Sequence, residues 1–230
     1  ANNASSVFIT YNTAIGYEAL KGSSTAANNT GIRNTAIGYQ TLLNNTTGRD
    51  NTANGYTALS ANTTGLSNTG FGAYALKSNT TANQSVAIGY SSLYTNTTGS
   101  SNTAIGSVAL YTNSTGNENT AVGIETLLSN TTGDGNSATG YQALFSNTTG
   151  EENTAVGYKS MRGNTTGEAN TGIGLNALTT NTTGSDNTAF GSDADVGANN
   201  LTNATAIGHG AIVSASNKIR LGDDNVTSIE

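Results

Sequence analysis

The stretch Asn34-Thr35-Ala36-Ile37-Gly38-Tyr39 returns seventeen residues later as Asn51-Thr52-Ala53-Asn54-Gly55-Tyr56. An earlier copy starts at Asn12, twenty-two residues before Asn34, and so carries five extra residues. The opening then recurs every seventeen residues, from Asn68, Ser85, Asn102, Asn119, Asn136, Asn153, Asn170 and Asn187, with a degenerate unit from Ala204. A fixed short period means that each unit is one turn of structure, which buries its apolar side chains only by stacking on its neighbours. The repeat therefore predicts one elongated domain.

Composition alone would favour disorder. Leu, Ile, Val and Phe together make up 39 of 230 residues, which is 17% of the chain and below the level at which most chains build a core. Two observations outweigh this. The net charge is only −6, and the large apolar residues recur at fixed positions, where stacked units would align them. The absence of proline also suits uninterrupted strand ladders.

We number the unit from position 1 at Asn34. Position 5 is Gly in all twelve copies, position 3 is always Ala or Gly, and position 8 is always Ala, Ser or Thr. Such uniform smallness indicates that backbones approach closely there.

Large apolar residues occupy position 4 (Ile37, Phe71, Ile105 and their equivalents) and position 9 (Leu42, Leu76, Leu110 and theirs). Alternation across Thr-Ala-Ile-Gly is the period of a strand, so position 4 faces one side while positions 3 and 5 face the other. We expect the Ile and Leu side chains to point into the coil. The Ala and Gly row would then form a flat outer strip that packs against other copies of the chain.

Asn-Thr-Thr-Gly segments such as Asn45–Gly48 supply a turn, and charges gather directly after them, where the corner should face water. Glycine and the Asn-Thr-Thr segments recur so often that no stretch long enough for a helix remains between them. The prediction is all-β: a parallel β-solenoid of about twelve coils, roughly 55–60 Å long at about 4.8 Å per strand. Residues 1–203 would form the repeat solenoid, and residues 204–230 a degenerate final coil that leads to a following stem or neck.

Ser85-Val86-Ala87-Ile88-Gly89 resembles the YadA-like head repeat of trimeric autotransporter adhesins. The ending, with Asn217–Gly222 and Asn225–Ile229, is similar both to the exit of such heads and to the repeat-to-stem junction of phage tail fibres. The resemblance implies a left-handed parallel β-roll, a homotrimer, and a location on a cell or virion surface. The Asn-Thr-Thr-Gly insertion makes this unit longer than the usual adhesin repeat, so adhesin ligands are not carried over.

Residues that could carry chemistry are few. His209 is the only histidine, and with no cysteine a catalytic triad or a zinc site finds no support. Asp193, Asp195, Asp223 and Asp224 could offer oxygen ligands to calcium, but they lack an ordered loop pattern. Asp195 replaces Leu at position 9 and should weaken the core locally and mark a transition. We expect no catalytic residue, metal site or cofactor, and no enzymatic activity.

Two further patterns have both a structural and a functional interpretation. Tyrosines form a row at position 6, and aromatics recur at position 10; stacking between coils and glycan binding are both consistent with them. Asn-Xaa-Thr sequons could accept glycans, but turn asparagines that stack into a ladder explain them better. The rows are Tyr17, Tyr39, Tyr56, Tyr90, Tyr141 and Tyr158; Tyr94, Tyr111 and Phe145; and Asn45, Asn62, Asn79, Asn96, Asn130, Asn147, Asn164 and Asn181.

The function that these observations favour is structural and adhesive: a rigid surface rod or head that projects, or itself contacts, a host-surface protein or glycan. A phage tail-fibre shaft is the alternative within that class. Ice binding and polysaccharide hydrolysis find less support, because no outward Thr-Xaa-Thr pair recurs and the carboxylates vary between units. Only eight basic residues are present, which argues against nucleic acid, and no apolar run approaches membrane-spanning length.

Overall fold

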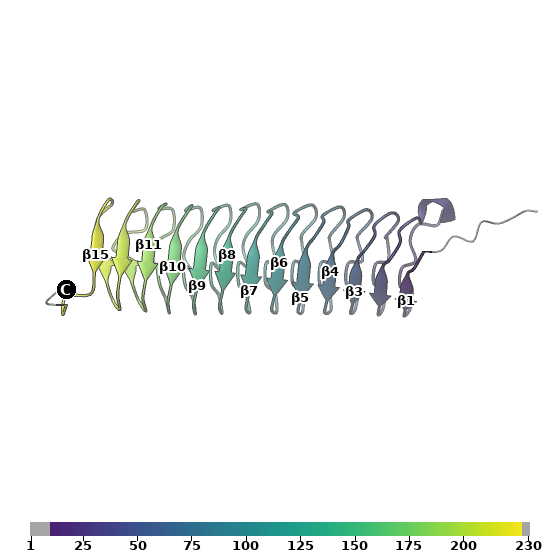
Figure 1. Ribbon diagram of the computed structural model, residues 1–230, viewed down its shortest axis with the longest axis horizontal. Helices are drawn as coiled ribbons and strands as arrows, with labels where there is room; N and C mark the ends of the chain where they lie inside the picture. The colour runs from purple at the N-terminus through teal and green to yellow at the C-terminus, as the bar shows by residue number, and fades with distance from the viewer. Residues whose placement is uncertain (1–9, 227–230) are drawn as a thin grey trace, which may run out of the picture.

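A computed structural model describes residues 10–226 as a straight rod of stacked coils (Figure 1). The predicted parallel β-solenoid with a 17-residue repeat is confirmed. One strand from each coil joins a thirteen-stranded sheet, in the order β1 to β11, then β13 and β15. Its strands are β1 Thr13–Ile15, β2 Thr35–Ile37, β3 Thr52–Asn54, β4 Thr69–Phe71, β5 Val86–Ile88, β6 Thr103–Ile105, β7 Thr120–Val122, β8 Ser137–Thr139, β9 Thr154–Val156, β10 Thr171–Ile173, β11 Thr188–Phe190, β13 Thr205–Ile207 and β15 Ile219–Leu221.

The strands are parallel and in a register that places identical positions above one another. Thr103 pairs with Thr120, and Ala104 pairs with Ala121. Hydrogen bonds between coils continue beyond the strands: the Leu110 N–H, for example, donates to the carbonyl of Thr126 at 3.0 Å. Because each coil bonds only to its two neighbours, the fold is held together by local, repeated contacts.

The glycine at position 5 is required by both conformation and space. Gly123 has a φ of +134°, and a methyl group built on it would lie 2.6 Å from the carbonyl oxygen of Gly140 in the next coil. L-residues rarely adopt this φ, and a side chain here would push the coils apart. The close backbone approach predicted from the sequence is confirmed at this position.

The expected orientation of positions 3 and 4 is wrong. The alanines at position 3, such as Ala104, are fully buried, and they line the coil interior together with the leucines at position 9, such as Leu110. The position-4 side chains point outward instead, and Ile88 and Ile105 are both exposed. The interior is narrow because it also holds asparagine side chains at positions 1 and 12, so position 3 has room only for alanine or glycine.

Three non-glycine positions in a regular coil adopt the left-handed conformation, which the sequence did not predict. In the coil from Asn102 these are Val108, Leu110 and Glu118, at positions 7, 9 and 17, with φ between 50° and 57°. These kinks allow the adjacent positions 8 and 9 both to face inward, which an extended strand forbids. Each such residue is unfavourable by about 1–2 kcal/mol, more for a β-branched side chain. Position 9 is Leu or Met throughout the regular coils, whereas position 7 includes the β-branched Thr57 and Val108.

The last coils differ from the regular ones. β12 (Asp195–Val196) pairs with β14 (Ile212–Val213) in a separate two-stranded parallel sheet. There the inward residue moves from position 9 to position 10, so Val196 and Val213 are buried while Asp195 is only partly so. Asp195 marks a transition, as predicted. Val196 fills the interior in place of position 9, and the Asp195 carboxylate accepts hydrogen bonds from the Thr180 N–H and hydroxyl.

The first unit, which is five residues longer than the others, contains η1 (Ala26–Asn28), a single 3-10 turn near the N-terminal end of the rod (Figure 1). Within residues 10–226, no helix has the length and apolar character needed to cross a bilayer.

Candidate interaction surfaces

The outer face of the long sheet carries a row of exposed apolar side chains. It consists of two rows, Thr, Ser or Val at position 2 and mainly Ile, Val or Phe at position 4. Phe71 and Phe190 are each more than half exposed. One apolar side chain therefore protrudes from almost every coil along the rod. An apolar row of this kind, interrupted only at Asn54 and Thr139, is typical of an interaction surface.

The position-6 tyrosines stack on one another between coils. The ring centroids of Tyr17 and Tyr39 are 5.4 Å apart, and those of Tyr39 and Tyr56 are 5.1 Å apart. Tyr74, which lies at position 7, packs edge-on against both Tyr56 and Tyr90. The predicted stacking is confirmed for Tyr17, Tyr39 and Tyr56 and for Tyr141 with Tyr158. Stacking covers the ring faces that meet, which a sugar would otherwise use.

A cation joins this aromatic cluster. Lys77 donates a hydrogen bond to the Tyr94 hydroxyl at 3.0 Å and lies 5.4 Å from the Tyr74 ring centroid. The hydrogen bond with Tyr94 raises the pKa of Lys77. Lys77 therefore links the side chains of Tyr74 at position 7 and Tyr94 at position 10.

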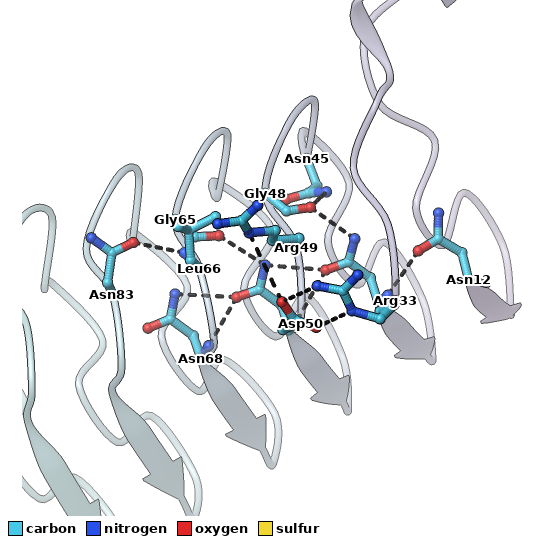
Figure 2. A network of polar contacts seen from close by, with 12 residues as sticks. Asn12, Arg33, Asn45, Gly48, Arg49, Asp50, Gly65, Leu66, Asn68 and Asn83 are labelled. Carbon is cyan, nitrogen blue, oxygen red and sulfur yellow. Dashed lines mark hydrogen bonds and ion pairs between the residues drawn. The ribbon is translucent and has the colours of Figure 1, made fainter. Parts of the chain in front are cut away.

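Two rows of asparagine amides run inside the rod, at positions 1 and 12. Figure 2 shows Asn12 and Asn68 of the first row and Asn45 of the second. At position 12, Asn113 Nδ2 donates to Asn96 Oδ1 and to the Gly116 carbonyl, both at 2.9 Å. At position 1, Asn136 Oδ1 accepts the backbone N–H of Asn153. The predicted asparagine ladder is confirmed. The eight sequon asparagines predicted to form it are buried, so the closed coil leaves no room for a glycan on these eight.

The corner at positions 16 and 17 holds nine of the chain's 22 charged residues and faces water, as predicted. Arg33 and Asp50 form a bidentate ion pair across two coils, with Nε to Oδ1 at 2.6 Å (Figure 2). The hydrogen bonds from Arg33 hold the pKa of Asp50 below its ordinary value. Acidic residues dominate the later coils; Glu151 and Glu152 are exposed, whereas Asp134 is half-buried and accepts the Asn117 N–H.

The candidate chemical groups near the C-terminal end have separate structural partners. His209 is exposed. Asp193 accepts hydrogen bonds from Asn176 and Ser192, chiefly Asn176, which lowers its pKa. Asp223 accepts from the Asn225 N–H and side chain, which lowers its pKa, and Asp224 pairs with Arg220. Among the residues that the structure describes, no three His, Asp or Glu side chains gather around a common cation position.

A hollow of about 390 Å³ lies at the C-terminal end, between the last two strands. Its lining mixes apolar and charged side chains: Ile212, Val213, Ile219 and Leu221, with Lys218, Arg220 and Asp223.

Comparison of the chain with protein-family models and with curated proteins finds no match.

Proposed function

We propose that this chain is a rigid, non-catalytic rod of a cell or virion surface, and that copies pack side by side through the outer face of the long sheet. The observation that carries the proposal is the apolar row at position 4. Its side chains protrude at the spacing of the coils, about 4.8 Å. Along its whole length, such a surface is matched by another surface with the same period, and a second copy of the chain provides one.

The resemblance to YadA-like heads favours three chains with parallel axes. The interface proposed at position 4 replaces the one expected at position 3, because the position-3 alanines are buried inside each coil. The rod would project a binding tip, or contact a host-surface protein or glycan along its sides. A phage-fibre shaft uses the same architecture, and sequence beyond this chain distinguishes the two.

Native mass spectrometry tests the assembly, with an expected mass of three times the 23.1 kDa chain. The pair Ile88→Asp and Ile105→Asp places charges on the outer strand face and should yield monomers. The pair Thr98→Asp and Thr115→Asp is the matched control, because these side chains are also exposed but lie ten positions further round the coil. A monomeric wild type, or equal dissociation by both pairs, would overturn the proposed interface.

The rigid-rod role has its own test. Deleting residues 102–135 removes two coils and keeps the register, so the particle should shorten by about 10 Å and remain folded. Small-angle scattering measures the length, and circular dichroism reports the fold. Loss of the β-sheet signal would contradict a rod whose coils contact only their neighbours.

A further inference from the structure

The last strand, β15, differs from all the earlier strands of the sheet at positions 2 and 3. In the pairing of β13 with β15, Ile219 lies under Thr205 and Leu221 lies under Ile207. Both outward positions are therefore large and apolar, and Ile219 is 72% exposed. In the other twelve strands of the sheet, the outward position 2 is Thr, Ser or Val.

The inward position of β15 is charged. Arg220 lies under Ala206, where every earlier strand has Ala or Gly. Its Nε donates to the Gly222 carbonyl at 2.9 Å, and its guanidinium pairs with Asp224. An inward-pointing charge blocks a further coil from stacking on this edge. The apolar side chains of β15 thus contribute little to the core of their own coil.

We propose that β15 is the anchor at which copies of this chain join, with Ile219 and Leu221 of each copy forming a shared apolar core at the C-terminal end of the rod. The proposal rests on the homo-oligomeric rod inferred above. The two side chains continue the outer strand face in register, next to Ile207 and Phe190. In an assembly with parallel axes, identical residues meet at the same height. The adjoining hollow of about 390 Å³ gives room for side chains of a neighbouring copy.

The test compares the two ends of the same face. The double variant Ile219→Asp, Leu221→Asp removes the anchor, whereas Ile15→Asp adds a charge at the other end, on a side chain that is also exposed. Sedimentation over a dilution series gives the concentration at which each assembly dissociates. We expect that concentration to rise on the order of a hundredfold or more for the double variant, and less than tenfold for Ile15→Asp. The conservative variant Ile219→Leu should assemble like the wild type.

The outcomes separate the two proposals. A wild type that is monomeric at every concentration refutes the homo-oligomeric rod. An oligomeric wild type whose β15 and Ile15 variants dissociate equally refutes the anchor alone. Circular dichroism of the double variant provides the third readout: an unchanged β-sheet signal supports an intermolecular role, whereas loss of that signal would assign the two side chains to the fold of the single chain and refute the anchor.

Discussion

The regular coils (residues 34–186) and the closing coils (residues 187–226) continue one long sheet, but they differ in which positions of the unit face the interior. From residue 34 to residue 186, alanine at position 3 and leucine or methionine at position 9 fill the interior, and asparagine rows line it. In the closing coils, valine at position 10 takes the place of leucine, Ala204 interrupts the position-1 row, and Arg220 occupies the inward position of the last strand. The same sheet register is thus compatible with two cores.

The difference shows what a coil needs in order to be stacked on both sides. An inner coil must fill its interior with side chains small enough for its neighbours and must satisfy every buried amide. A terminal coil has no neighbouring coil on one side, so these two requirements do not apply there. It can therefore carry a charged side chain at the position where inner coils carry alanine. The following variants, from the largest expected effect to the smallest, test this distinction.

Glycan attachment should distinguish the buried asparagines of the regular coils from an exposed asparagine of the closing coils. Asn130 in a regular coil is buried, whereas Asn200 of Asn200-Leu201-Thr202 in the closing coils is exposed. In a host that N-glycosylates, mass spectrometry of the protease-resistant fraction should find glycan at Asn200 and none at Asn130. Thr132→Ala removes the Asn130 sequon without touching the amide row and serves as control. A folded chain with glycan on Asn130 would contradict the buried ladder.

The position-1 asparagines should be the most sensitive to substitution. Asn136→Ala leaves the buried N–H of Asn153 without its acceptor and opens a cavity, which we expect to cost about 2–4 kcal/mol in unfolding free energy. Asn136→Ser should cost less, because Ser85 at the same position already accepts the Asn102 N–H with its hydroxyl. Urea unfolding of both variants measures the difference. Equal losses would show that the amide row does not stabilise the regular coils.

The left-handed leucines provide the next test. Leu110→Val places a β-branched side chain at a φ of 50° and removes one methylene, so it should cost about 2–3 kcal/mol. Leu128→Val is the same chemical change at half-buried position 10, where φ is not positive, and should cost under about 1 kcal/mol. Thermal unfolding compares them. If the two variants have the same melting temperature, the positive φ does not explain why position 9 is leucine.

Overpacking should have the smallest of these effects. Ala104→Leu adds three carbons to a filled interior between two coils, at an expected cost of about 1–3 kcal/mol. Glu118→Leu changes an exposed corner residue and should be within about 0.5 kcal/mol of the wild type. Circular dichroism melts of both variants check this prediction. If Ala104→Leu were as stable as the wild type, position 3 of the regular coils would tolerate a large side chain, as it does in the last coil, where Arg220 occupies it.

Several features of the structure could be predicted from single residues. Gly123 and its equivalents predicted close backbone approach, and the turn asparagines predicted a stacked ladder, because each residue type has few other uses at a fixed spacing. The tyrosine row predicted stacking for the same reason. The orientation of Ile105 and Ala104 could not be obtained this way. Strand alternation fixes which residues share a face, but not which face is inside.

By itself, the sequence determined a parallel stack of seventeen-residue coils, since the period, the glycines and the absence of proline admit few other folds. Only the tertiary structure decided which residues are inside. The left-handed residues at positions 7 and 9 bring two adjacent side chains inward, and the asparagine rows then leave space for alanine but not for isoleucine. Because backbone conformation and interior volume set this outcome, the apolar row of position 4 was left on the outside of the rod.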